Sequence, residues 1–269
     1  MQNIKKLITS SLLFSCVLLI SKSSESDMVH NYKIKTVVID AGHGGKDPGC
    51  HGKSHNEADI TLKVALALGK LIKENLPEVK VVYTRKDNHF VELHDRAAIA
   101  NKNSADFFIS IHCNSNPNKD VTGSETYTMG MHKTESNLEV AKRENAVVLQ
   151  EDNYLEKYDG FDPTSPLAHI LFMNYQNAYM VNSVKFADKV ERCMSEQTGL
   201  KSRGVRQAGF LVLWKTTMPA ALVEIGFLSN NSDEKLLGDL DGQHKIAAGI
   251  YEAFNSYKTD METKGHSNK

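Results

Sequence analysis

The chain has 269 residues, of which 41% are hydrophobic and 24% are charged, and its formal net charge at pH 7 is −1. This length fits one large domain or two small ones, and the composition is that of an ordinary globular protein. Because there is neither a basic excess nor an acidic block, the sequence excludes a polybasic nucleic-acid-binding protein and a charged disordered tail.

The N-terminus has the layout of a secretory signal peptide. Lys5 and Lys6 precede an apolar run over residues 7–20, and a serine-rich polar stretch follows. The run is short for a membrane span, which needs about 20 apolar residues. We therefore predict a cleaved signal over residues 1–23, with a retained anchor as the alternative. A polar linker over residues 24–33 follows, and export to the periplasm or cell envelope is expected.

Three cysteines, Cys50, Cys113 and Cys193, remain after removal of the predicted signal. Three cysteines cannot all pair within one chain, so the sequence excludes a disulfide scaffold. A bridge between Cys50 and Cys113 is conceivable, because both flank the polar segments described below. Free, buried thiols are the expectation that we prefer.

Strand and helix patterns alternate from about residue 34. The predicted strands cover Lys35–Ala41, Val79–Thr84, Asp106–His112, Gly123–Met129 and Pro219–Gly226. The predicted helices cover Ala58–Glu74, Leu93–Asn101, Glu135–Gln150, Pro166–Thr198 and Lys245–Tyr257. Helical spacing of apolar residues identifies the first helix. The third and last strands are almost continuously apolar, as strands buried on both faces are.

This alternation predicts the α/β class: a single three-layer domain with a mostly parallel twisted sheet flanked by helices. We place the domain at residues 34–258, with a helical or loop insertion at about 131–170 and a polar tail over 259–269. The segment Glu151–Ser165 within the insertion is polar and rich in turn residues. A loop of this length is often a lid or a regulatory element, although a solvated connector fits it equally well.

Two histidines follow the ends of predicted strands. His43 lies in the glycine-rich segment 41–49, directly after the first strand, and His112 ends the third strand. In open α/β sheets, binding sites gather where parallel strands end. Each histidine alone is a weak signal, because turns often contain histidine beside glycine and strand ends often contain a histidine with a purely structural role.

Two glutamates accompany the histidines. Glu57 begins the first helix, where the helix dipole favours a carboxylate even without a metal. Two histidines and one carboxylate are also the ligand set of many catalytic zinc sites. Glu224 lies in an apolar strand, where an unpaired ionised carboxylate is costly. It must therefore lie at the strand mouth, pair with a cation or with water bound to one, or have a raised pKa, and each case suits a general base.

Four segments together resemble the zinc-dependent N-acetylmuramoyl-L-alanine amidases of bacterial cell walls. They are Asp40–Gly45, Asn56–Glu57, Ser110–Asn114 and Val223–Asn230. The similarity extends over about residues 35–257. It implies one Zn²⁺ per chain bound by His43, Glu57 and His112, with Glu224 as the catalytic base. The implied substrate is peptidoglycan, cleaved at the amide between the muramic lactyl group and L-alanine.

The resemblance also implies substrate and regulatory contacts. Arg203, before the last strand, is a candidate substrate-binding residue, although a salt-bridged surface arginine fits it as well. In amidases used in daughter-cell separation, a helical segment blocks the site until an activator protein binds. By this resemblance a carboxylate of segment 134–145 blocks the zinc position here, and Glu144 is the first candidate. A solvated helix face is the alternative.

Two other function classes remain open at this point. A zinc peptidase that acts on wall peptides or proteins would use the same metal chemistry. A non-catalytic wall-binding module derived from an enzyme is the second class, and it would have no need for a base such as Glu224.

Overall fold

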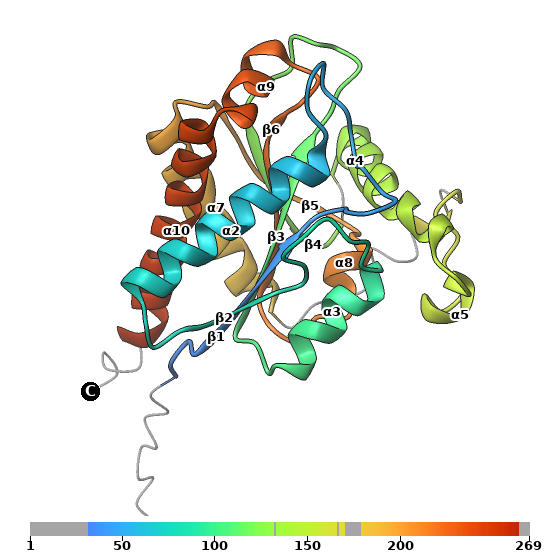
Figure 1. Cartoon of the computed structure of the whole chain (residues 1–269). Coiled ribbons are helices and arrows are strands. Elements are labelled where there is room, and N and C mark those ends of the chain that lie inside the picture. The colour runs from blue at the N-terminus through green and yellow to red at the C-terminus, as the bar shows by residue number, and fades with distance from the viewer. Residues whose placement is uncertain (1–31, 132, 166, 170–178, 264–269) are drawn as a thin grey trace, which may run out of the picture.

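The computed structural model describes residues 32–131, 133–165, 167–169 and 179–263. Within these residues a six-stranded sheet forms the centre of the molecule, in the order β2-β1-β3-β6-β4-β5 (Figure 1). The strands are β1 (Thr36–Ala41), β2 (Lys80–Tyr83), β3 (Phe107–Asn114), β4 (Ser124–Met129), β5 (Ser202–Ala208) and β6 (Ala220–Phe227).

Four of the strands, β2, β1, β3 and β6, are parallel to one another. β4 runs antiparallel to β6, and β5 is parallel to β4, so one edge of the sheet runs in the opposite direction. The predicted α/β fold with a mostly parallel sheet is confirmed. The sequence does not predict β5, because its residues are mostly polar and half-buried, as is common at a sheet edge.

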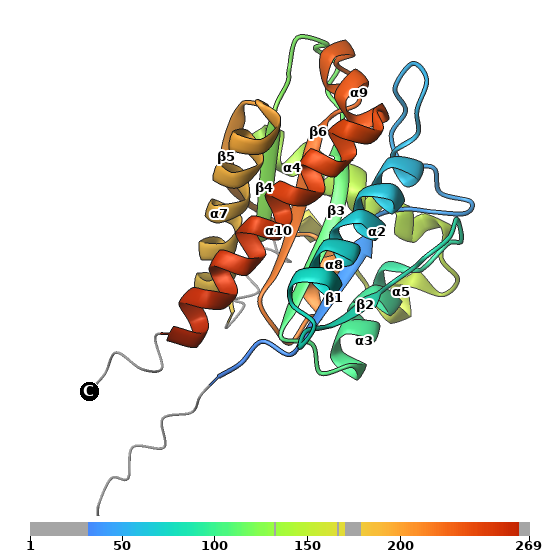
Figure 2. The same cartoon turned by 60° about the vertical axis from the view of Figure 1, so that its left-hand side comes forward.

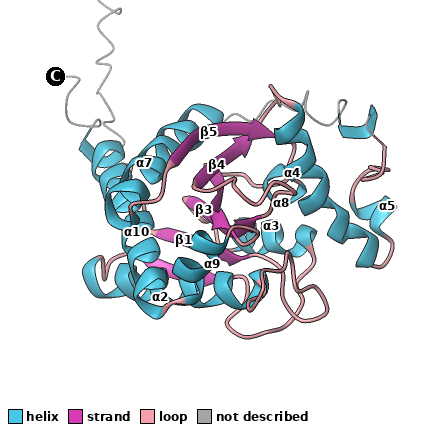
Figure 3. Ribbon diagram, turned by 90° about the horizontal axis from the view of Figure 1, so that it is seen from above, coloured by secondary structure: helices cyan, strands magenta, loops and turns pink. Residues whose placement is uncertain are grey.

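Helices cover both faces of the sheet (Figures 2 and 3). They are α2 (Glu57–Asn75), α3 (Leu93–Lys102), α4 (Glu135–Asn145), the 3-10 helix η1 (Ala146–Gln150), α5 (Tyr154–Lys157), α7 (Met180–Thr198), α8 (Leu211–Trp214), α9 (Asn231–Gly238) and α10 (Leu240–Thr263). α2, α7 and α10 lie on one face, and α3, α4 and α8 lie on the other. The predicted three-layer arrangement is therefore present.

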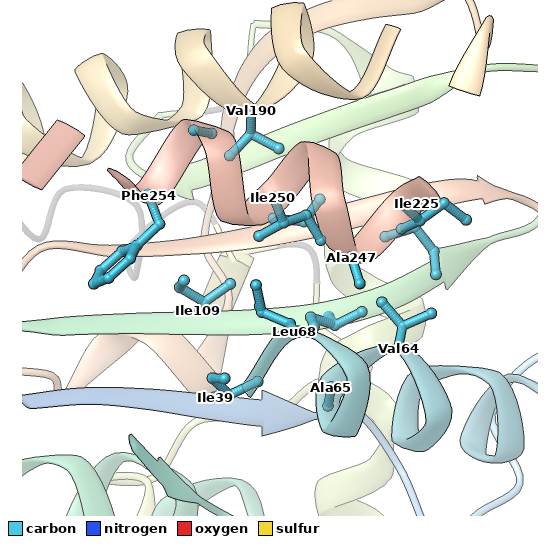
Figure 4. Close-up of a cluster of buried hydrophobic side chains, with 14 of the residues drawn as sticks. Ile39, Val64, Ala65, Leu68, Ile109, Val190, Ile225, Ala247, Ile250 and Phe254 are labelled. Carbon is cyan, nitrogen blue, oxygen red and sulfur yellow. The ribbon is translucent and has the colours of Figure 1, made fainter. Parts of the chain in front are cut away.

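The larger core lies between the sheet and the layer of α2, α7 and α10 (Figure 4). Alternate strand residues point into it, among them Ile39, Ile109 and Ile225. Leu68 of α2 and Ile250 of α10 pack against them, and all five side chains are completely buried. Burial of side chains of this size stabilises the fold by about 1.5–3 kcal/mol each. The residues that alternate with them along the strands face the opposite layer, where α4 lies.

The segment Glu151–Ser165 packs against the domain and is not a solvated connector. Tyr158 and Phe161 are buried in the second core, on the α3 and α8 side of the sheet. The carboxylate of Glu151 accepts hydrogen bonds from the Leu93 backbone N–H at 2.9 Å and from the Tyr158 hydroxyl at 2.7 Å. These contacts attach the predicted insertion to the start of α3.

Several element boundaries differ from the predicted ones. The predicted helix Glu135–Gln150 is α4 followed by η1, and α10 begins earlier than predicted and continues into the predicted polar tail. α7 forms the C-terminal part of the predicted helix Pro166–Thr198, whose residues 166 and 170–178 lie outside the described residues. α8 and α9 are too short to show a helical period in the sequence.

The predicted signal peptide over residues 1–23 lies outside the described residues, as does most of the predicted linker. Residues 264–269 of the predicted tail also lie outside them. In the part of the chain that the structure describes, no helix is long and apolar enough to cross a membrane.

Candidate active site

His43 follows the carboxyl end of β1 in a left-handed backbone conformation, with a φ of 61°. Residues other than glycine rarely adopt this conformation, so the surrounding structure must stabilise it. Gly42 lets the ring of His112 lie directly against the backbone, because a Cβ at Gly42 would be 2.5 Å from His112 Cε1. The two imidazole rings consequently approach to 4.9 Å between centroids.

Two buried arginines support the His43 loop. Arg96 donates from Nη1 to Asp40 Oδ1 and from Nη2 to the His43 carbonyl oxygen, each at 2.8 Å. Arg85 donates to two further carbonyl oxygens at the end of β1. Burial alone would raise the pKa of Asp40, but the positive charge of Arg96 and hydroxyl donors keep this pKa below its ordinary value. Asp40 therefore remains an ionised partner for Arg96.

Asp47 orients the His43 ring. Its Oδ2 lies 2.7 Å from His43 Nδ1, and its other oxygen accepts from the Gly49 backbone N–H. This contact favours the tautomer with the proton on Nδ1 and turns Nε2 toward the centre of the site. Asp47 is not among the predicted site residues, although a carboxylate four residues after a glycine-flanked histidine is a recognisable signal.

Glu57 is completely buried at the start of α2. Its Oε2 accepts from the Cys50 backbone N–H at 2.9 Å, and its Oε1 accepts from that of Cys113 at 2.8 Å. Oε1 also lies 3.0 Å from both His43 Nε2 and His112 Nδ1. The carboxylate therefore faces the two imidazoles and does not cap its own helix.

Glu144 of α4 completes a cluster of four side chains. Its Oε2 lies 3.2 Å from His43 Nε2 and 3.0 Å from His112 Nδ1, and its side chain is 4% exposed. One ligand atom from each of His43, Glu57, His112 and Glu144 lies within 4.8 Å of all the others. The alternative of a solvated helix face is wrong for Glu144, although it describes the exposed Glu139 of the same helix.

The four donor atoms could hold one metal ion. Among the described residues, the buried His43 Nε2 and Glu144 Oε2 lie 3.2 Å apart, but neither has a partner in hydrogen-bonding geometry. Ligands about 2.0 Å from a tetrahedral zinc ion are about 3.3 Å apart, and each imidazole nitrogen here lies 3.0–3.2 Å from each carboxylate oxygen. Burial alone would lower the pKa of His112, but Glu144 raises it to about 9. A metal ion would replace the proton that these carboxylates attract.

Glu224 lies beside the cluster, directly opposite His112 in the pairing of β6 with β3. It is completely buried, and neither carboxylate oxygen has a hydrogen-bond partner among the described residues. Burial, reinforced by the negative charge of Glu144, raises the pKa of Glu224 well above its ordinary value. A carboxyl group of this kind can accept and release a proton next to a metal ion.

Arg143 precedes Glu144 on α4 and contacts both glutamates. Its Nε lies 3.0 Å from Glu144 Oε1, and its Nη2 lies 3.5 Å from Glu224 Oε1. It also donates to the Ser115 carbonyl oxygen and to Asn114 Oδ1, each at 3.1 Å. α4 is therefore attached to the carboxyl end of β3. Arg143 is not among the predicted site residues, and its position next to Glu144 is the only sequence signal for it.

Arg203 lies on β5 and lines a groove of about 530 Å³ beside the cluster. Its Nε donates to Glu125 Oε1 at 2.6 Å, and its guanidinium carbon lies 5.4 Å from the centroid of the Phe227 ring. Arg143 lines the same groove. Arg203 thus forms the salt bridge expected of a structural surface arginine. It also borders the candidate site, as a substrate-binding residue would.

His51 and His55 lie outside the cluster and contact neighbouring polar residues. The three cysteines of the described residues are free, so the prediction of free thiols is confirmed and the conceivable bridge is absent. The Cys50 thiol instead donates to the Cys113 carbonyl oxygen at 3.1 Å. The thiol thereby supports the backbone that positions Glu57.

Comparison with known proteins identifies the family to which the chain belongs. The sequence profile described as N-acetylmuramoyl-L-alanine amidase matches residues 37–256. The chain belongs to this family. N-acetylmuramoyl-L-alanine amidase AmiA of Escherichia coli K12 is 30% identical over 239 residues, which cover 87% of this chain and 80% of that protein.

Solved structures of amidases share the fold. The catalytic domain of the amidase CwlV from Bacillus (Paenibacillus) polymyxa var. colistinus has 33% identity and a TM-score of 0.61, over 83% of this chain and 97% of that one. The CwlD amidase of Clostridioides difficile, solved in complex with the GerS lipoprotein, has 24% identity and a TM-score of 0.62, over 84% and 99%.

Membership of this amidase family confirms the predicted enzyme class and its peptidoglycan substrate. The structure brings together all four residues predicted for the chemistry, namely His43, Glu57, His112 and Glu224, at one end of β1, β3 and β6. It adds Asp47 to them as a residue that orients a histidine.

Proposed function

We propose that this amidase uses one zinc ion bound by His43, Glu57 and His112, with Glu224 as the general base. The observation that carries the proposal is the convergence of three buried ligand atoms beside a buried carboxylate without a hydrogen-bond partner among the described residues. A zinc ion bound there would polarise the substrate carbonyl and make water a better nucleophile at neutral pH.

Glu224 supplies the proton transfers in this proposal. It removes a proton from water as the water oxygen attacks the carbonyl carbon of the lactyl group. It then delivers that proton to the L-alanine nitrogen as the C–N bond breaks. A carboxylate with a raised pKa suits the first step, because it is a stronger base toward water than an ordinary glutamate. Its carboxylic acid form then holds the proton that the leaving nitrogen needs. The products are a lactyl carboxylate and a free amine.

We also propose that α4 holds this amidase in an inhibited state. Glu144 Oε2 lies near both imidazoles, in the position where water or substrate would otherwise approach the metal. Arg143 simultaneously lies 3.5 Å from the base Glu224. α4 therefore blocks the metal position with Glu144 and contacts the base with Arg143. In this proposal α4 must move before peptidoglycan can bind.

An activator protein that displaces α4 is the partner this arrangement calls for. We propose that the amidase is exported through its predicted signal peptide, acts in the periplasm or cell envelope, and serves daughter-cell separation. The substrate supports an extracytoplasmic site of action, because peptidoglycan lies outside the cytoplasmic membrane. The N-terminal Lys5 and Lys6 and the apolar run after them support export.

Removal of metal tests the zinc assignment. Purified protein should contain about one zinc per chain, and treatment with a chelator should lower its Tm by about 5–10 °C, because a tightly bound ion stabilises only the folded state. Without the ion, the two carboxylates and two imidazoles of the cluster should no longer be held together by a shared metal. Elemental analysis and thermal unfolding are the measurements. A Glu57→Gln variant should lack the shift, and a wild-type protein with neither metal nor shift would contradict the assignment.

A further inference from the structure

A row of side chains crosses four neighbouring strands at the level of the site. His112 on β3 pairs with Glu224 on β6, and Glu224 pairs with Glu125 on β4. Residues that pair directly in a ladder point to the same face of the sheet. Beyond Glu125, the next strand in the sheet is β5, where Arg203 lies.

A bulge directs Arg203 toward this row. Ser124 pairs with Ser202 and Thr126 with Val205, so β5 has one residue more than β4 over this stretch. Such bulges re-aim a side chain and are common beside active sites. The φ of 85° at Gly204 is the local conformation that the extra residue requires. The Arg203 side chain consequently reaches Glu125 instead of continuing the strand alternation.

Two neighbouring residues fix the orientation of the Arg203 guanidinium and leave its terminal nitrogens available to a ligand. Glu125 accepts from its Nε, and the ring of Phe227 lies beneath it. Glu125 is itself buried and accepts from the Tyr127 hydroxyl at 2.7 Å. The two terminal nitrogens of Arg203 donate no hydrogen bond to any described residue. A planar fork oriented in this way matches a carboxylate.

The groove next to Arg203 carries more positive than negative groups. Lys119 and Arg203 line it outside α4, together with the carboxylate of Glu125, and α4 adds one positive and one negative group, Arg143 and Glu139. Glu125 is already paired with Arg203 and lies 3.4 Å from a second arginine, Arg206. Arg203 is 29% exposed and therefore accessible from the groove. The groove thus suits an anionic ligand near its Arg203 end.

We propose that Arg203 binds a free carboxylate of the stem peptide, beyond the L-alanine whose amide is cleaved. The inference rests on the assignment of Glu224 as the base, because that assignment fixes where the amide lies. Arg203 is two strands from Glu224, or about 10 Å at about 4.8 Å per strand. A peptide extends about 3.3–3.6 Å per residue, so the second or third stem residue reaches Arg203.

Synthetic N-acetylmuramoyl tetrapeptides provide the test. One has D-glutamate as its second residue and diaminopimelate as its third, one has the free carboxylate of the second residue amidated, and one has the side-chain carboxylate of the third amidated. Turnover is measured in the Glu144→Ala background. With Arg203 present, kcat/KM for one of the two amidated substrates should be about 10- to 100-fold lower than kcat/KM for the unmodified tetrapeptide, mainly because KM rises. In the Arg203→Gln variant, the ratio of kcat/KM for the unmodified tetrapeptide to kcat/KM for that amidated substrate should lie within about twofold of one.

Arg206→Gln is the matched control, because Arg206 lies on the same strand and near the same Glu125 but does not line the groove. It should keep the preference for the carboxylate. If the parent does not distinguish the three substrates, or if Arg203→Gln slows all three equally, the inference is wrong. Dissociation constants for the same compounds, measured on the Glu144→Ala, Glu224→Gln double variant, should give the same ratio without turnover. Turnover by the parent therefore tests the reaction, and the ratio tests Arg203.

Discussion

Glu144→Ala should raise the basal hydrolysis of purified peptidoglycan by about 10- to 1,000-fold. The expected range follows from the proposed inhibition, because a minor open state of this kind is typically populated at about 0.1–10%. Removal of the carboxylate frees the position beside His43 Nε2 and His112 Nδ1. The remaining ligands should retain the metal, because three protein ligands suffice for a catalytic zinc site. Release of soluble wall fragments by the wild type and by the variant is the measurement.

Glu135→Ala is the control for this result. Glu135 begins the same helix and is exposed, so its loss removes an equal charge from α4 without touching the site. Its basal rate should equal that of the wild type. An Arg143→Ala, Glu144→Ala double variant should be at least as active as the single one, since it also removes the contact with Glu224. Equal basal rates for wild type and Glu144→Ala would exclude inhibition through this residue.

Glu224→Gln should lower the turnover of peptidoglycan by about 10²- to 10⁴-fold, which is the usual contribution of a general base. The amide has nearly the same volume as the carboxylate but cannot take a proton from water. The substitution should not impair folding, because both Glu224 oxygens lack hydrogen-bond partners among the described residues. The rate is best compared in the Glu144→Ala background, where the parent rate is highest.

Metal content separates the base from the ligands in the same experiment. Glu224→Gln should retain about one zinc per chain, because Glu224 is not part of the four-residue cluster. Glu57→Gln should lose most of its zinc, because its carboxylate faces both imidazoles. Loss of zinc from the Glu224 variant would make that residue a ligand, and an unchanged rate would exclude it as the base.

The core elements of the fold were predictable because their sequence patterns are strong. β3 and β6 are continuous apolar runs, and α2 has a clear helical period. β5 escapes prediction because an edge strand buries few side chains, and the sequence Ser202–Ala208 contains mostly polar residues. The boundary between α4 and η1 escapes it as well, since a 3-10 turn continues the same chain direction with different hydrogen bonding.

The candidate site was predictable wherever a residue lies inside a recognisable segment. Polar residues that follow or interrupt apolar strands are easy to recognise in the sequence, and His43, His112 and Glu224 are residues of this kind. Arg143 and Glu125 have no such signal, because their roles arise from pairings between segments distant in sequence. Glu125 meets Glu224 only through the antiparallel pairing of β4 with β6, an orientation that alternating strands and helices do not predict.

Mass analysis of peptidoglycan fragments, with and without chelator, tests the central claim most directly. The Glu144→Ala protein should release intact stem peptides with a free L-alanine amine and leave glycan chains that end in lactyl carboxylates. Chelation should stop this release, and added zinc should restore it. Cleavage within the stem peptides would instead indicate a peptidase, and binding to the wall without any zinc-dependent release would indicate a non-catalytic module. Either result would contradict a zinc-dependent amidase site built from His43, Glu57, His112 and Glu224.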